Sequence, residues 1–135
     1  MFEFPSRLHW LLAAAALLLA SQAFAADVYV ISNGALSMTA EEVKEVFLGE
    51  TQFSGSLKLL PVDNAAAQPD FLAHVLKMSA PKYSAAWMKK AFRDGLNAPS
   101  QKASDVEVLM FVRNNPGAIG YVNAEPHGVH VVGKY

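Results

Sequence analysis

Polar side chains follow three apolar runs of the chain, at the point where each run ends. They are Ser32 and Asn33, Asp63 and Asn64, and Tyr121 and Asn123. Their hydroxyl, amide and phenol groups can hydrogen-bond a small polar ligand such as an oxyanion. The Asp63 carboxylate repels a dianion unless it accepts the ligand's proton or pairs with a cation, for which Lys102 and Arg93 are candidates. The alternative is structural, since Asx residues cap helices and form turns in most proteins.

The sequence offers little for catalysis or for metal binding. It contains no cysteine, no GxSxG nucleophile motif and no Walker phosphate loop. His127 and His130 suggest a metal pair, but residues three apart in an extended segment point to opposite faces and cannot share an ion. We therefore predict a protein that is not an enzyme and that uses no metal or other cofactor.

The first 25 residues have the pattern of a secretory signal peptide. Arg7 precedes the apolar run 10–20, which is too short to span a bilayer, and Ala23 and Ala25 are the small residues of a peptidase site. Cleavage after Ala25 predicts an exported, periplasmic domain of residues 26–135. The formal net charge of −1 argues against a nucleic-acid partner.

Signals for strands and helices alternate along residues 26–135. Apolar and β-branched runs predict strands over 27–31, 57–62, 118–122 and 129–132. Helical spacing and capping residues predict helices over 40–47, from 69, over 81–93 and over 105–112, with the polar segment LNAPSQKA (96–103) as a loop. The alternation predicts an α/β fold: one three-layer lobe with a small mixed, mostly parallel sheet flanked by about four helices. Ligands of such sheets bind at the carboxyl ends of the strands, so we expect the six polar side chains to gather there.

The helix predicted over 81–93 is strongly amphipathic. One half of its circumference is apolar and holds Tyr83, Trp87, Met88, Ala91 and Phe92. The spacing assigns Tyr83, Trp87 and Phe92 to the core, with stacking on a ligand as the alternative. The other half carries a basic stripe of Lys82, Lys89 and Arg93. The stripe is either a surface for an acidic partner or an anion, or a solvated helix face.

Gly120 lies inside the apolar run AIGYV (118–122). A missing side chain weakens a strand unless another part of the molecule approaches the backbone closely. A packed helix and a ligand are the two alternatives, and we predict that a helix packs against this glycine.

Four segments together resemble the periplasmic phosphate-binding proteins of ABC transporters: FLG (47–49), LLPVD (59–63), FLAHVL (71–76) and PGAIGYV (116–122). The similarity spans nearly all of residues 26–135 and matches the second lobe of those two-lobed proteins. Short, single-lobe members of this type 2 periplasmic-binding superfamily are named phosphate transporter substrate-binding proteins. The resemblance implies a substrate-binding protein that holds a small oxyanion such as phosphate, with an ABC transporter permease as its partner.

Two hypotheses of function follow from these patterns. In the first, helix amides and the polar side chains at the strand ends bind an oxyanion weakly, because DNAAAQP (63–69) lacks the arginine and the Gly-Ser-Thr run that two-lobed members generally carry there. In the second, the chain keeps the fold, has lost ligand binding and is an interaction or sensory module for another periplasmic or membrane protein.

Overall fold

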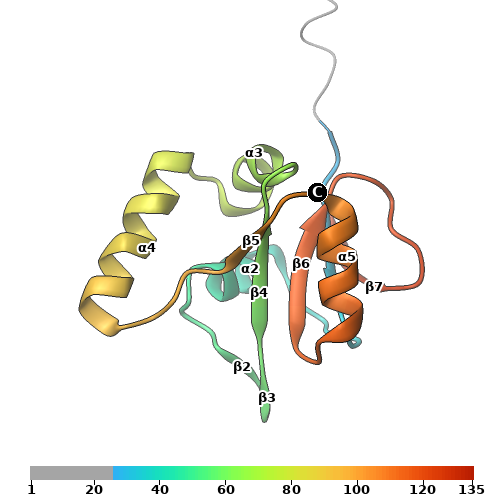
Figure 1. Cartoon of the computed structure of the whole chain (residues 1–135), viewed down its shortest axis with the longest axis horizontal. Helices are drawn as coiled ribbons and strands as arrows, with labels where there is room; N and C mark the ends of the chain where they lie inside the picture. The colour runs from blue at the N-terminus through green and yellow to red at the C-terminus, as the bar shows by residue number, and fades with distance from the viewer. Residues whose placement is uncertain (1–25) are drawn as a thin grey trace, which may run out of the picture.

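A five-stranded mixed sheet forms the centre of the computed structural model, which describes residues 26–135 (Figure 1). Its strands, in spatial order, are β5 (Ser100–Lys102), β4 (Leu60–Asn64), β6 (Ala118–Val122), β1 (Tyr29–Ser32) and β7 (His130–Lys134). β5, β4 and β6 run parallel, whereas β1 is antiparallel to both of its neighbours. The predicted leader and its cleavage site after Ala25 fall outside the described residues.

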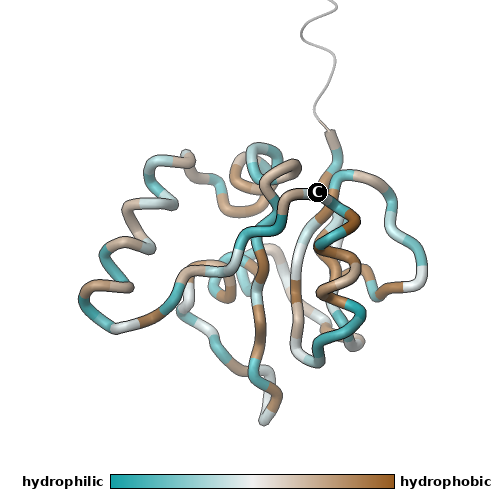
Figure 2. The backbone as a smooth tube through the Cα atoms, viewed as in Figure 1, coloured by the Kyte–Doolittle hydropathy of each residue, from teal (hydrophilic) through white to brown (hydrophobic). Residues whose placement is uncertain are grey.

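Helices cover both faces of this sheet. On one face α5 (Asp105–Asn114) packs with Val108 and Val112 against the strands. On the other lie α2 (Ala40–Phe47) and α3 (Gln68–Phe71), which continues into the π-helical turn η1 (Leu72–Leu76). Figure 2 shows brown, apolar segments along β4 and teal alternating with brown along α5, as an interior strand covered on both faces and a half-buried helix require. The predicted α/β fold is confirmed.

Local capping signals account for most helix boundaries. Thr39 and Glu42 form a reciprocal capping box at the start of α2, and the Ser104 hydroxyl accepts from the backbone N–H of Glu107 at the start of α5. α4 (Ala80–Asp94) begins after Ser79 and ends at Gly95, which is left-handed with φ +66°.

Gly120 lies directly beneath α5. A Cβ atom at this position would come within 2.7 Å of Val108 Cγ1 and 3.0 Å of Val62 Cγ2, closer than carbon atoms pack. The prediction that a helix approaches this glycine is confirmed. Gly117, three residues before Gly120, lies in the turn that leads into β6 and has φ +82°. A Cβ at Gly117 would clash with the carbonyl oxygen of Lys58, so this turn also requires glycine.

Two predicted segments differ from the structure. The strand predicted over 57–62 is divided, because β3 (Leu57–Lys58) pairs with β2 (Phe53–Ser54) as a separate hairpin before β4 begins at Leu60. The predicted polar loop contains β5, which pairs with β4 from Val62 opposite Ser100 to Asn64 opposite Lys102. The side chains of SQK give no strand signal, since β5 is held at the edge of the sheet through its backbone.

α4 stands to one side of the sheet rather than over it (Figure 1). Only Tyr83 and Trp87 of its 15 residues are buried. Phe92 is 96% exposed, so the prediction that it belongs to the core is wrong, and Met88 on the same apolar arc is 73% exposed. The core uses one border of the apolar arc, and the rest of the arc faces solvent.

Candidate functional site

The structure divides the predicted site between the two opposite ends of the strands. At one end lie Asp63, Asn64, Tyr121 and Asn123, because β4 and β6 run parallel and their carboxyl ends coincide. At the other end lie Ser32 and Asn33, because β1 runs in the opposite direction. There the Asn33 backbone N–H donates to Ala118 O at 3.0 Å, its side-chain amide donates to Val112 O at 2.8 Å, and the Ser32 hydroxyl donates to Gly34 O. The expected gathering of all six side chains is therefore wrong.

Asp63 is a buried carboxylate held between two tyrosines. The Tyr83 and Tyr121 hydroxyls each donate to it at 2.8 Å. Burial raises the pKa of Asp63 above its ordinary value, although the two tyrosine hydrogen bonds act in the opposite direction. Burial and the neighbouring Asp63 charge also raise the pKa of both tyrosines. The arrangement ties α4, through Tyr83, to the carboxyl end of β4.

A second carboxylate, Asp105, occupies the centre of the strand ends. It accepts from the Asn64 side-chain amide at 2.7 Å, from the Asn123 N–H at 3.2 Å and from the Ala124 N–H at 3.0 Å. Convergent N–H groups of this kind are the donors with which a protein holds an oxyanion. Here the chain's own carboxylate takes up all three.

The remaining hydrogen-bonding capacity of these side chains is also used internally. The Asn64 side-chain oxygen accepts from Ala66 N–H, and the Asn123 amide donates to Asp27 O and to the Asp70 carboxylate. Within residues 26–135, every buried side-chain nitrogen and oxygen has a hydrogen-bond partner. We call these hydrogen bonds among Asn64, Asp70, Asp105 and Asn123 the strand-end network. The network occupies the carboxyl ends of β4 and β6, as the structural alternative for the Asx residues expects.

The cations proposed for Asp63 are engaged elsewhere. Arg93 pairs with Asp94 at 3.2 Å, and the Lys102 ammonium lies 4.9 Å from the centre of the Phe111 ring. The sequence did not predict that Asp105 accepts these hydrogen bonds, because residues 104–107 show only the pattern of a helix start. No local signal could have revealed it, because its three donors come from β4 and from the segment after β6.

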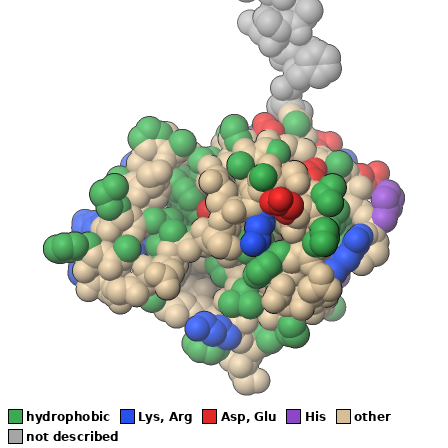
Figure 3. All heavy atoms as spheres, viewed as in Figure 1, with side chains coloured by type: hydrophobic (Ala, Val, Ile, Leu, Met, Phe, Trp, Pro, Cys, Tyr) green, Lys and Arg blue, Asp and Glu red, His purple; other side chains and the backbone are tan. Residues whose placement is uncertain are grey.

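The outward face of α4 is apolar at its centre and basic along one side. At 100° per residue, Met88 and Phe92 lie opposite the buried Tyr83 and Trp87. The predicted basic stripe, Lys82, Lys89 and Arg93, is exposed beside them. Figure 3 shows apolar side chains on the outer surface of this part of the molecule, with basic ones next to them.

Three anchors hold α4 on its inner side. The Trp87 indole N–H donates to Phe47 O at 3.0 Å, Lys90 donates to Leu48 O, and Tyr83 donates to Asp63. The Trp87 ring also lies against Gly49, where a Cβ would come within 2.7 Å of it. The helix is therefore fixed by a few strong contacts and leaves a broad surface free.

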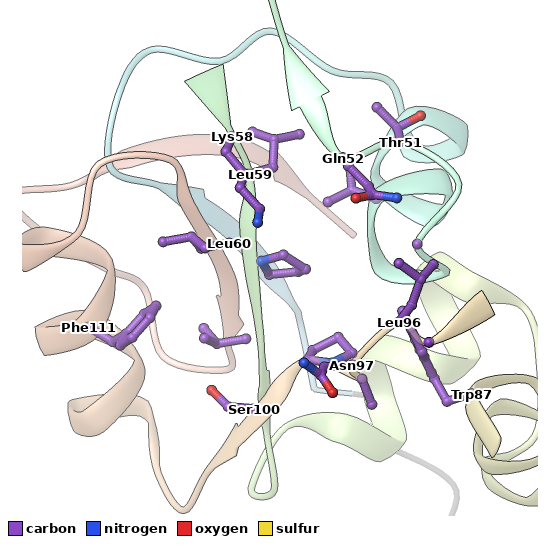
Figure 4. A pocket seen from close by; sticks show the side chains of 17 residues that line it. Thr51, Gln52, Lys58, Leu59, Leu60, Trp87, Leu96, Asn97, Ser100 and Phe111 are labelled. Carbon is purple, nitrogen blue, oxygen red and sulfur yellow. The ribbon is translucent and has the colours of Figure 1, made fainter. Parts of the chain in front are cut away.

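An open groove of about 480 Å³ lies away from the strand-end network, beside the first half of β4. Figure 4 shows Phe111 on one side of it, Trp87 and Leu96 on the other, and Leu60 between them. None of the six polar side chains predicted as ligands lines this groove.

His127 and His130 make separate backbone contacts. The Arg113 guanidinium donates to His127 O, and the His130 ring nitrogen lies 3.0 Å from Leu36 O. Over residues 26–135, no three His, Cys, Asp or Glu side chains come together as a metal site would require.

No helix in that range has the length and apolar character to cross a membrane. Neither a protein-family model nor a curated protein matches this sequence.

Proposed function

We propose that this chain is an exported protein-interaction module that presents the outward face of α4 to a partner protein. The observation that carries the proposal is the 96% exposure of Phe92, beside Met88 and next to a basic stripe. Aromatic and methionine side chains with arginine at the border are the residues in which protein interfaces are enriched. Burial of each apolar side chain by a partner contributes about 1.5–3 kcal/mol.

The charge of α4 specifies the chemistry of the partner. Lys82, Lys89 and Arg93 lie on one side of the apolar centre. A complementary surface has an apolar pocket for Phe92 and acidic side chains along one border, which would steer association and weaken it as salt rises. A periplasmic or membrane protein with such a surface is the partner we propose, an ABC transporter permease included.

The oxyanion hypothesis is the less favoured function because the strand-end donors are already satisfied. A phosphate ion would have to displace the Asp105 carboxylate or bind beside it, where like charges repel. We expect phosphate to bind no more tightly than on the order of 100 μM, about 5.5 kcal/mol. Submicromolar binding of phosphate to the isolated monomer, with sulfate as the control in a calorimetric titration, would establish the transport-binding function instead.

The interaction is tested by affinity capture from the envelope of the producing cells. We compare the unaltered protein with Phe92→Ser, with Lys89→Glu, and with Val106→Ser, a control on α5 that is 65% exposed. The proposal expects one partner protein to be retained by the unaltered chain and by the control and lost by both α4 variants, with retention falling as salt rises. Equal capture by all four chains would place the interaction outside α4 and overturn the proposal.

A further inference from the structure

We infer that the groove beside β4 binds a small amphiphile, a molecule with an apolar body and a single acidic group. Its volume of about 480 Å³ lies in the range of small-molecule sites, and its lining is mostly apolar, with a few polar groups at the ends. The site is separate from the outward face of α4 and does not depend on the function proposed above.

The groove exists because β5 joins β4 late. The first paired residues are Val62 and Ser100, so Pro61 and Pro99 face each other just before the pairing begins. Neither proline has a backbone N–H, so the hydrogen-bond ladder between β4 and β5 cannot extend to them, although Pro61 still pairs with β6 on its other side. Gly95 turns the chain out of α4 in a left-handed conformation, and the segment 96–99 then runs apart from β4. The sequence thus builds an opening between two neighbouring strands.

The opening leaves apolar side chains accessible on an interior strand of the sheet. Leu60, at the start of β4, is 36% exposed on the floor of the groove. Two aromatic side chains line opposite sides of the groove, Phe111 from α5 and Trp87 from α4 (Figure 4). Flat walls of this kind and an aliphatic floor suit the alkyl or aromatic body of a ligand.

Charge indicates the polar end of the ligand. Lys58 is the one charged residue among those that line the groove, and Figure 4 shows its side chain directed toward Leu60. The ion pairs found within residues 26–135 involve Lys90, Arg93 and Lys134, so Lys58 is not engaged in any of them. A single unpaired ammonium at the mouth of an apolar groove is complementary to one acidic group. Asn97 and Ser100 line the other end.

Decanoate, with decan-1-ol as its uncharged counterpart, tests this inference. In the processed protein Trp87 is the one tryptophan, because the other, Trp10, belongs to the predicted leader, so its fluorescence reports on the groove wall directly. We expect saturable binding of both compounds, with decanoate about fivefold tighter, the discrimination that a partly exposed ion pair supplies. In Lys58→Met the preference for the acid over the alcohol should disappear, whereas Lys77→Met, at an exposed lysine that does not line the groove, should keep it.

A second variant tests whether the two compounds bind in the groove, and it does so without removing a charge. Ala98 lines the groove and is exposed, so Ala98→Phe should fill the space and lower the affinity for both compounds at least tenfold while circular dichroism shows an intact fold. Binding that is unchanged in Ala98→Phe, or an acid preference that persists in Lys58→Met, would overturn the inference. Absence of saturable binding to the unaltered protein would do the same, and it would leave the α4 interface, which Phe92→Ser tests, unaffected.

Discussion

α5 and α4 begin alike and are used differently. Each starts at a serine whose hydroxyl accepts a backbone N–H, and each has an apolar face. α5 lies over the sheet, where Gly120 removes a side chain so that Val108 and Val112 can approach the strands. α4 stands beside the sheet, buries only Tyr83 and Trp87, and is anchored through these two residues and Lys90. The difference teaches that helical periodicity predicts an apolar face but not how much of it the protein's own core will cover.

The largest expected effect separates the two sides of α4. Trp87→Ala removes a buried ring and the hydrogen bond to Phe47 O, and we expect it to lower the free energy of unfolding by about 3 kcal/mol or more. Phe92→Ala is the matched control, an aromatic truncation in the same helix at a 96% exposed position, expected to change stability by less than about 0.5 kcal/mol. Urea denaturation followed by circular dichroism measures both. Equal losses would mean that the outward face of α4 is packed in solution.

The close approach of α5 is tested at Gly120. Gly120→Val would place methyl groups where Val108 and Val62 already lie, and overpacking of this kind costs about 1–3 kcal/mol. Gly34→Val is the control, since a Cβ at Gly34 meets no atom within 4 Å. Thermal unfolding should show a clear loss for the first variant and little change for the second. An unchanged Tm in Gly120→Val would contradict the packing of α5 on β6.

Local signals in the sequence predicted the elements that they control directly. The capping residues Thr39 and Ser104, the stop at Gly95 and the apolar run 118–122 each act within a few residues, and the corresponding boundaries agree closely with the structure. The need for a glycine at position 120 was also predicted, because a gap in an apolar strand requires a neighbour to fill it.

Features that depend on distant pairing were not predicted. The direction of β1 is set by its partners β6 and β7, whose paired residues lie 87 to 105 positions away along the chain. The sequence around Ser32 therefore could not show that this residue lies at the opposite end of the strands from Asp63. The same is true of Asp105, whose donors come from residues 64, 123 and 124. The four polar residues at the ends of β4 and β6 do lie together, but they hydrogen-bond to Asp105, to Asp70, to Tyr83, to one another and to the backbone, and these contacts occupy the groups that a ligand would need.

The smallest expected effect concerns the pH dependence of the anchor between α4 and the sheet. In the unfolded chain Asp63 titrates near 3.8, and burial raises its pKa in the folded protein. Below both values the carboxyl is protonated in both states and has no effect on stability through ionisation. As pH rises past 3.8 the unfolded chain releases its proton first, so the stability contributed by this residue falls until the folded pKa is passed.

Asp63→Asn removes this titration and keeps a polar group between the tyrosines, since an amide can accept from one hydroxyl and donate to the other. We therefore expect the Tm of the unaltered protein, relative to that of Asp63→Asn, to decline as the pH rises above 3.8. Tyr83→Phe sharpens the test, because it removes a hydrogen bond that favours the charged carboxylate and should extend the decline to higher pH. A relative Tm that rises with pH would show that the two tyrosine hydrogen bonds outweigh burial and that α4 is held most firmly by the ionised carboxylate.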